Sequence, residues 1–424
     1  MTRAATVEVL RNDAACFDGV DLHALAQRMG TPLQAYSASA IRERIGTLQT
    51  ALQGLDALIC YAAKANSNIA ILQLMADAGL GADIVSSGEM RRSLRAGIPA
   101  ERIVFSGVGK SADEIAEALT AGIARFNVES EDELHLLQRL ASERHLTAHA
   151  SVRINPDVDA LTHAKISTGK SENKFGVSID EARRWFDMRL THVRLDGLHV
   201  HIGSQMLTLD PIHKALQRVA GFWREVTANG HAINCIDVGG GLGVEYRSGR
   251  DQPVAIDDYA RVIRHALGDF EGRILLEPGR WLVAEAGVLL TRVVRIKHGR
   301  RRDFLVVDAA MTDLLRPSLY DAWHDIVPLI DEPRAPRTYD VVGPVCESSD
   351  TFARGRELPN CEPGDLLMIK ATGAYGASMA SNYNSRPLAA EVLLDRGRYA
   401  VVRRRQTFDE MIAGEQPAEN WESV

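Results

Sequence analysis

From about residue 58 to residue 280, short apolar runs alternate with longer stretches in which apolar residues recur at helical spacing. Between residues 66 and 79, for example, Ile69, Leu72 and Ala76 fall on one side of a helix. Each apolar run ends in small or polar residues. Eight runs can be counted, and they end near Lys64, Ser86, Gly107, Ser130, Asn155, Gly203, Gly241 and Gly279. Eight strand–helix units predict an α/β fold with a parallel (β/α)8 barrel of the TIM type.

A doubly wound open sheet is the alternative architecture for alternating strands and helices. The number of units and the absence of a G-x-G-x-x-G fingerprint favour the barrel. Ser111 and Ser130 each precede a glutamate, Glu114 and Glu133, by three positions. Both pairs predict a capping box at the start of a helix.

After about residue 285 the pattern changes to β-rich runs separated by Pro and Gly turns, such as VLLTRVVRIKHG (288–299). These runs predict a second, mostly antiparallel β domain. The early run Leu33–Tyr36 is a strand that the barrel does not need, and we assign it to the second domain. The predicted division is therefore a barrel over 38–282 and a β-rich domain made of 1–37 and 283–424. A long polar insertion, 155–176, follows the fifth barrel strand, and its length is typical of functional or mobile loops.

Composition narrows the class of protein. The chain has 424 residues, which suits about two domains, and its 46% hydrophobic and 25% charged residues are ordinary for a globular protein. A formal charge of −7 offers no basic field for nucleic acid. The N-terminus has no apolar core of a secretory signal, and no run is long enough to span a membrane, so we expect a cytoplasmic protein with no membrane partner. Five scattered cysteines argue against a disulfide framework or a structural zinc site.

Candidate catalytic residues lie at the ends of the first and eighth predicted strands, because barrel enzymes place their chemistry at the carboxyl ends of strands. Lys64 ends the first strand, where desolvation would favour a neutral, nucleophilic amine able to form a Schiff base with an aldehyde cofactor. A solvated surface lysine is the alternative. Glu277 ends the eighth strand, and a carboxylate beside a pyridine nitrogen makes such a ring a strong electron sink.

The loops after the seventh and eighth strands are rich in glycine, at 239–241 and at Gly279. Barrels often bind phosphate in these loops, although tight packing is the alternative explanation for the glycines. His199 and His201 are predicted on the sixth strand at a spacing of two, so they would face the same side. A metal site is disfavoured because a third ligand of suitable spacing is missing, and His201 is better interpreted as an aromatic lid over a flat cofactor.

Long specific motifs then run in order over nearly the whole chain. They are YAAKANSN (61–68), RINPDVDALTHAKISTGKSENKFG (153–176), GLHVHIGSQ (197–205), DVGGGLG (237–243), EPGR (277–280), RPSLYDAWH (316–324), GPVCESSD (343–350) and GAYGASMASNYNSRP (373–387). Through them the chain resembles the diaminopimelate decarboxylases, which are fold-type-III enzymes that use pyridoxal 5'-phosphate (PLP). The resemblance implies a PLP-binding barrel and a β domain that contributes to the active site and the dimer interface.

The resemblance also implies roles around the cofactor. Lys64 would hold PLP through a Schiff base, Glu277 would pair with the pyridine nitrogen, and His201 would stack on the ring. The phosphate and its surroundings would be contacted by Ser204, Gly239, Gly240, Gly241, Pro278, Gly279, Arg280 and Tyr375.

For the substrate, the resemblance implies that the distal amino-acid end is held by Arg280, Arg316, Tyr320, Glu347 and Tyr375. Cys346 would donate a proton to the carbanion left after CO2 departs. In this family Cys346 and Glu347 come from the neighbouring subunit, so a homodimer with shared active sites is implied.

The function implied by the resemblance is decarboxylation of meso-2,6-diaminopimelate to L-lysine and CO2, the last step of lysine biosynthesis. A same-fold decarboxylase acting on ornithine, arginine or carboxynorspermidine is the alternative, and it would differ at Arg316 and Tyr320. A non-catalytic PLP-carrier barrel would need neither Cys346 nor the second domain. An amino-acid racemase usually has a weak electron sink, which Glu277 opposes.

Overall fold

The computed structural model describes residues 15–160, 174–330, 332–419 and 421. By their contacts these residues form two compact units, and each unit is described by itself. One unit consists of Ala38–Ala286 and Gly373–Ser378. The other consists of the described residues within Met1–Ser37, Gly287–Thr372 and Met379–Val424. The short segment 373–378 thus groups with the first unit, although the boundaries expected from the sequence assign it to the β-rich part.

The first unit is a closed barrel of eight parallel strands, which confirms the predicted (β/α)8 architecture. The chain visits neighbouring strands in order, and β11 closes the ring by pairing with β4. The strands are β4 (Ala57–Ala62), β5 (Gly81–Ile84), β6 (Ile103–Phe105), β7 (Arg125–Val128), β8 (Ala148–Arg153), β9 (Val193–His199), β10 (Cys235–Asp237) and β11 (Arg273–Leu276).

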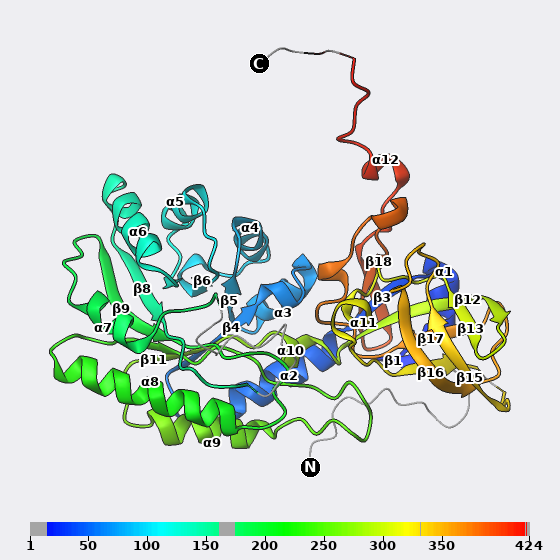
Figure 1. The fold of residues 1–424 in the computed structure, drawn as a ribbon, viewed down its shortest axis with the longest axis horizontal. Coiled ribbons are helices and arrows are strands. Elements are labelled where there is room, and N and C mark those ends of the chain that lie inside the picture. The colour runs from blue at the N-terminus through cyan, green and yellow to red at the C-terminus, as the bar shows by residue number, and fades with distance from the viewer. Residues whose placement is uncertain (1–14, 161–173, 331, 420, 422–424) are drawn as a thin grey trace. The chain divides into compact units, whose positions relative to one another are not determined.

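Helices connect these strands and cover the outside of the barrel, with α4, α5 and α6 on one side and α8 and α9 on the other (Figure 1). They are α2 (Ala38–Ala51), α3 (Ile69–Asp77), α4 (Ser87–Arg95), α5 (Ala112–Ala121), α6 (Glu131–Glu143), α7 (Ile179–Phe186), α8 (Asp210–Ala228), α9 (Ile256–Leu267) and the short α10 (Arg280–Val283). Most of the polar insertion predicted over 155–176, namely 161–173, lies outside the described residues.

Serine side chains cap several of these helices, as the sequence predicts. Ser111 accepts a hydrogen bond from the backbone of Glu114, and the Glu114 carboxylate returns one to Ser111, so the predicted capping box is complete. Ser130 accepts from the backbone of Glu133, but the Glu133 carboxylate bonds elsewhere, to Lys110 and to the backbone N–H of residue 129. The second capping box is therefore only half formed, because a buried ammonium attracts the carboxylate.

The barrel interior is layered. Cys60, Val104, Cys235 and Leu275 form one apolar cluster inside the barrel strands. Because side chains two positions apart on a strand share a face, the next layer toward the carboxyl ends holds Ser106, Asp237 and Glu277. An apolar floor thus lies directly beneath a polar layer, and this places the candidate site at the mouth of the barrel.

The second unit is built on a nine-stranded, mostly antiparallel sheet. The predicted early strand is β3, and it lies between β12 and β18 in this sheet. The elements of this unit are β1 (Cys16–Phe17), β2 (Val20–Asp21), α1 (Leu22–Met29), β3 (Leu33–Ser37), β12 (Gly287–His298), β13 (Asp303–Val307), α11 (Arg316–Tyr320), β14 (Ile326–Leu329), β15 (Pro336–Val342), β16 (Thr351–Pro359), β17 (Leu366–Ile369), β18 (Ala390–Asp395), β19 (Arg398–Arg403) and α12 (Phe408–Met411).

Both faces of this sheet are packed. Along β12, Val288 and Leu290 belong to one core cluster, whereas Leu289 and Val293 belong to another. Neighbouring residues in the first half of the strand therefore bury against opposite layers, which explains why the run Val288–Leu290 is apolar without interruption.

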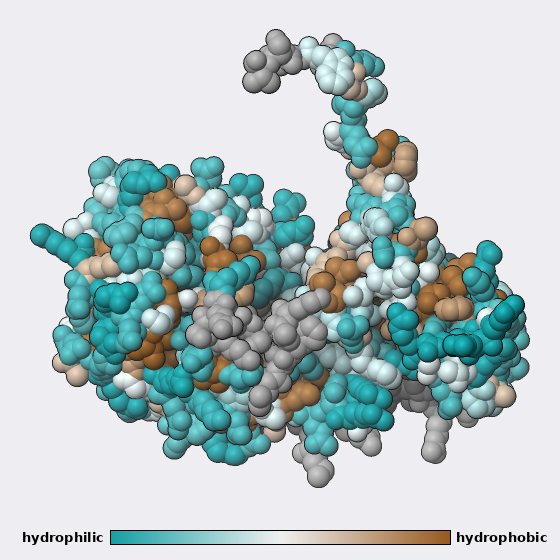
Figure 2. Space-filling model, in the orientation of Figure 1, coloured by the Kyte–Doolittle hydropathy of each residue, from teal (hydrophilic) through white to brown (hydrophobic). Residues whose placement is uncertain are grey.

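The outer surface of the barrel unit is mostly hydrophilic on the face seen in Figure 2, and the hydrophobic areas there are small and separate. Among the helices of the described ranges, none combines the length and the apolar composition needed to cross a membrane.

Candidate functional site

Lys64 lies in a single helical turn, Ala63–Ala65, that directly follows β4. Its Nζ is 2.6 Å from Oδ2 of Asp83, a fully buried carboxylate on the neighbouring strand β5. Burial lowers the pKa of the Lys64 ammonium, but the negative charges of Asp83 and Glu277 outweigh this effect and hold the pKa above its ordinary value. The expectation of a neutral amine is therefore wrong in this structure, because a carboxylate partner stabilises the charged form.

Glu277 follows β11 and is almost completely buried. Its Oε1 accepts hydrogen bonds from Ser106 Oγ at 3.2 Å and from Asn127 Nδ2 at 3.1 Å. Its Oε2 is 3.2 Å from Nε2 of His199, at the end of β9. Burial raises the pKa of Glu277, but the interactions with His199 and Lys64 lower it by a larger amount. The net pKa is therefore well below its usual range. Glu277 therefore carries a stable negative charge inside the barrel.

Asp237 ends β10 beside Glu277 but has the opposite protonation preference. Its Oδ1 accepts the N–H of Gly239 at 2.9 Å, and its Oδ2 is 3.4 Å from Nδ2 of Asn127. Burial and the negative charge of Glu277 raise the pKa of Asp237 well above its usual range. Of the two neighbouring carboxyl groups, Glu277 is therefore ionised and Asp237 is protonated.

Nothing in the sequence alone groups His199, Asp237 and Glu277 as a possible metal-ligand set, because they lie at the ends of three different strands. One ligand atom from each lies within 4.8 Å of the others, a spacing that a metal ion could bridge. Their hydrogen bonds to Gly239, Asn127 and each other already account for their positions. A protonated Asp237 is also a poor ligand, since metals prefer the ionised carboxylate.

His201 lies beyond the end of β9, so the prediction that it belongs to the sixth strand is wrong, whereas His199 is the last residue of that strand. The Nδ1 of His201 accepts the backbone N–H of Gly240 at 3.1 Å, which leaves the ring proton on Nε2. Burial and the positive charges of Arg153 and Lys64 lower the pKa of His201 to about 3. The ring of His201 is therefore neutral at ordinary pH.

The glycine turn after β10 packs against both neighbouring strand ends. A Cβ on Gly240 would lie 2.1 Å from the backbone oxygen of Glu277. A Cβ on Gly239, whose φ is +69°, would lie 2.3 Å from the backbone oxygen of Val200, and Gly241 has a φ of +107°. Close packing alone therefore requires glycine here, and the N–H groups of Gly239 and Gly240 bond to Asp237 and His201.

Pro278 and Gly279 tie the end of β11 to the lysine-bearing turn. The carbonyl of Pro278 accepts the N–H of Ala62 at 3.1 Å. A Cβ on Gly279 would lie 3.0 Å from the Cβ atoms of Ala62 and Ala65. The backbone after β11 thus runs directly beside Lys64.

Arg280 is a buried cation with several partners in the barrel unit. Its Nε and Nη2 donate to Ser204 Oγ at 3.2 and 2.9 Å, and its Nη1 donates to the hydroxyl of Tyr246 at 2.6 Å. Its Cζ lies 4.7 Å from the ring centroid of Tyr375, within cation–π range. Tyr246 was missed by the sequence analysis, although its place just after the glycine turn was an available signal.

Tyr375 is brought to the lysine-bearing turn by backbone hydrogen bonds. Its N–H donates to the carbonyl of Ala65 at 2.8 Å, and Asn66 Nδ2 donates to the carbonyl of Gly373 at 3.1 Å. Tyr375 also has a φ of +56°, which is uncommon for a residue other than glycine and is held by these contacts.

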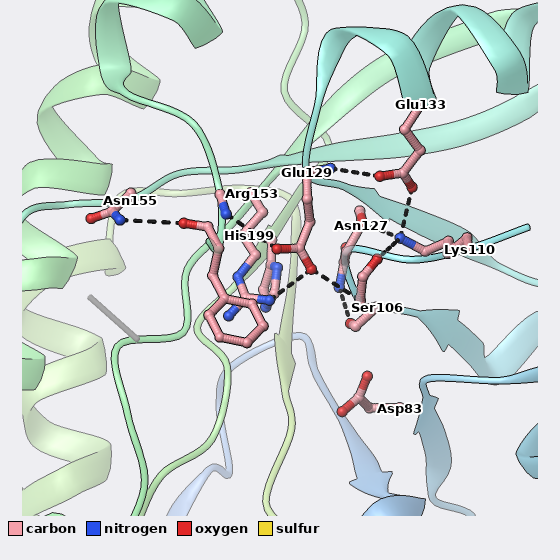
Figure 3. Close-up of polar contacts among 12 residues, drawn as sticks. Asp83, Ser106, Lys110, Asn127, Glu129, Glu133, Arg153, Asn155 and His199 are labelled. Carbon is pink, nitrogen blue, oxygen red and sulfur yellow. Dashed lines mark hydrogen bonds and ion pairs between the residues drawn. The ribbon is translucent and has the colours of Figure 1, made fainter. Parts of the chain in front are cut away.

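A charged network that the sequence analysis did not find supports the strand ends at β6, β7 and β8 (Figure 3). Lys110 Nζ bonds the carbonyl of Asn127 and the carboxylate of Glu133, each at 2.7 Å. Glu129 Oε1 accepts from Arg153 Nη1 at 2.7 Å. These buried pairs fix the strand ends from which Ser106 and Asn127 reach Glu277. They also fix Arg153, whose positive charge helps to lower the pKa of His201.

The β-rich unit carries the remaining predicted residues, Arg316, Tyr320, Cys346 and Glu347. Arg316 and Tyr320 begin and end α11, and Arg316 is buried, whereas Cys346 and Glu347 are exposed. A hydrogen bond links the segment around Cys346 to α11, since Ser318 Oγ donates to the carbonyl of Ser349 at 2.6 Å. The carboxylate of Asp350 accepts from the backbone N–H groups of residues 311 and 345.

Comparison with known proteins agrees with this geometry. Residues 38–284 match the family model described as pyridoxal-dependent decarboxylase, pyridoxal binding domain. A curated diaminopimelate decarboxylase of Pseudomonas aeruginosa is 48% identical and covers 95% of this chain and 97% of its own length. The chain belongs to the family of diaminopimelate decarboxylases.

Solved structures of the family have the same fold. The Helicobacter pylori enzyme complexed with L-lysine is 45% identical, has a TM-score of 0.89, and covers 93% of this chain and 98% of its own. The M. jannaschii enzyme, also with L-lysine, is 36% identical with a TM-score of 0.92 and covers 98% of this chain and 99% of its own.

PLP is the cofactor of this family, and the barrel mouth fits it. An amine, an ionised carboxylate and a neutral imidazole converge there from Lys64, Glu277 and His201, together with the backbone of the glycine turn. These groups match an aldehyde, a pyridine nitrogen, an aromatic ring and a phosphate. The individual contacts assigned to these residues remain predictions.

Lys64 should be the residue that binds PLP covalently, because its amine lies at the barrel mouth. Borohydride reduction followed by peptide mass mapping should find the pyridoxyl group on the Lys64 peptide. A label on another peptide of fully loaded protein would contradict the assignment.

Replacing Asp83 with Asn should lower the pKa of Lys64, because the carboxylate that stabilises the ammonium is removed. More neutral amine would then be present at a given pH, so the pH profile of PLP capture by apoenzyme should move to lower pH. Stopped-flow absorbance measures this rate, and Asp77→Asn, at an exposed carboxylate on α3, is the matched control. Slower capture by Asp83→Asn at every pH would indicate that Asp83 mainly orients the lysine.

Proposed function

We propose that this chain, with PLP bound, decarboxylates meso-2,6-diaminopimelate to L-lysine and CO2. The observation that carries the proposal is the near full-length match to diaminopimelate decarboxylases, together with an amine and an ionised carboxylate at one barrel mouth. PLP supplies an electron sink for the pair of electrons left at Cα when CO2 departs. The following roles belong to the side chains of this protein.

In the barrel, Glu277 would hold a proton on the pyridine nitrogen, because its own pKa is too low for it to take that proton. His201 would lie flat against the ring, since its Nδ1 is fixed by the N–H of Gly240 and its ring is uncharged. Lys64 would bind the cofactor between turnovers. Ser204, Arg280 and the glycine turn would bind the phosphate or its surroundings.

Substrate choice would depend on the distal end of the amino acid. Diaminopimelate ends in an ammonium and a carboxylate, whereas lysine and ornithine end in an amine alone. Arg316, with Arg280, would bind the carboxylate, and Glu347 would bind the ammonium, with Tyr320 and Tyr375 beside them. Leaving a buried arginine without its carboxylate costs roughly 2–5 kcal/mol, which is enough for strong discrimination.

Cys346 would protonate Cα, and we propose that it does so in the active site of a neighbouring subunit of a homodimer. Its exposed position on the β-rich unit, next to exposed Glu347, supports this role. A cytoplasmic location is likewise proposed. Decarboxylation of ornithine, arginine or carboxynorspermidine is less favoured, since the most similar relatives found are diaminopimelate decarboxylases.

Replacing Arg316 with Met should lower kcat/KM for diaminopimelate by roughly two to four orders of magnitude, equivalent to ~3–5 kcal/mol, because the fork that binds a carboxylate is lost. Turnover of lysine should fall far less, since lysine lacks that carboxylate. CO2 release from both substrates and the PLP content of the variant provide the measurement.

The control for this prediction is Arg354→Met, which removes an exposed guanidinium of the same unit. It should leave both activities unchanged. Equal loss of both substrates, or loss of PLP, in Arg316→Met would mean that Arg316 is structural.

Mixing two inactive variants, Lys64→Ala and Cys346→Ala, should restore activity if each site combines residues of two subunits. Subunit exchange would create some sites with both residues intact. The recovered CO2 release is compared with the heterodimer fraction seen by native mass spectrometry. Heterodimers without recovered activity would argue against a shared site.

A further inference from the structure

The motif RPSLYDAWH joins two buried polar side chains at its two ends. Arg316, at its start, is 5% exposed, and His324, at its end, is 1% exposed. Arg316 Nη1 lies 2.7 Å from Nε2 of His324. Asp321, with a φ of +51°, reverses the chain after α11, and the histidine thereby returns to the arginine.

A backbone contact fixes which ring nitrogen of His324 carries the proton. Nδ1 lies 2.8 Å from the carbonyl oxygen of Lys370, and a carbonyl can only accept, so Nδ1 is the donor. In the neutral ring, Nε2 then has a lone pair directed at Arg316. The guanidinium donates one of its five N–H groups to this lone pair.

The histidine itself has a rigid support. The N–H of Lys370 donates to the carbonyl of Asp325 at 2.9 Å, and Arg356 Nη2 donates to the carbonyl of His324 at 3.1 Å. Lys370 directly follows β17, so the imidazole is held against the end of a buried strand of the sheet. The acceptor for Arg316 therefore has a fixed position.

We propose that His324 is a positioning residue that orients the Arg316 guanidinium for the distal carboxylate of the substrate. The inference rests on the proposed role of Arg316. A neutral imidazole restrains a long side chain before binding, which lowers the entropy lost when the substrate is bound. It also adds no negative charge, so it does not compete with the substrate carboxylate as an Asp or Glu partner would. His324 thereby contributes to the selection of diaminopimelate over amino acids that end in an amine.

Two substitutions at His324 separate its two hydrogen bonds. His324→Asn keeps a donor near Nδ1 for the carbonyl of Lys370 but has no acceptor at the position of Nε2. His324→Gln reaches that position with an amide oxygen. In PLP-loaded enzyme, His324→Asn should lower kcat/KM for diaminopimelate roughly 10- to 100-fold, mainly through KM, since misplacing a binding group has effects of that order.

The Gln variant should recover most of this loss, and turnover of lysine should change little in either variant. His298→Asn, at an exposed histidine that ends β12, is the matched control and should behave as the parent enzyme. The double variant Arg316→Met/His324→Asn should be no worse than Arg316→Met alone, because the histidine would act only through the arginine.

The outcomes distinguish this inference from the proposed function. If the His324 variants match the parent enzyme while Arg316→Met loses diaminopimelate turnover, His324 is not a positioning residue but Arg316 keeps its role. If His324→Asn lowers lysine and diaminopimelate turnover equally, or lowers the PLP content, its effect is structural and the inference fails. If Arg316→Met retains selectivity for diaminopimelate, the roles proposed for Arg316 and His324 are both wrong. CO2 release from diaminopimelate by the parent enzyme would still support the proposed function.

Discussion

The negative charge of Glu277 inside the barrel is the constraint on which the candidate site depends. A buried carboxylate is unfavourable by several kcal/mol unless hydrogen bonds and positive charge compensate. Here Ser106, Asn127 and His199 supply those contacts, and they come from β6, β7 and β9. The charge is therefore stable only if the barrel closes in the correct register, which links the protonation state of the candidate site directly to the fold.

The charge of Glu277 influences the protonation states of the titratable groups around it. Asp237 is buried and lies close to Glu277, so a second negative charge there would be unfavourable and Asp237 holds a proton. Lys64 is attracted by Asp83 and Glu277 and holds a proton as well. Pairs of groups whose environments push their pKa values apart are typical of enzyme sites, and here one buried carboxylate sets the protonation state of its neighbours.

The sequence alone predicted the barrel, the extra strand at Leu33–Tyr36 and the places of Lys64 and Glu277 at the ends of barrel strands, because apolar runs and their ends are local features. It did not predict Asp83, Asn127 or Tyr246. These residues belong to no recognised motif, and their importance comes from neighbours on other strands. The expected neutral state of Lys64 was wrong for the same reason, since a pKa depends on partners in space and burial alone is only one of its causes.

Neutral hydrogen-bond partners hold a buried charged side chain both in the barrel and in α11 of the β-rich unit. A buried charged side chain can be positioned by neutral hydrogen-bond partners, which do not oppose its charge. Glu277 accepts hydrogen bonds from the neutral donors Ser106 and Asn127, in addition to its contact with His199. Arg316 likewise donates to His324. An opposite charge in either place would hold the side chain equally well but would reduce its field at the ligand. Lys64 differs, because its partner Asp83 is a carboxylate, and the negative charges of Asp83 and Glu277 keep the pKa of the ammonium high despite burial.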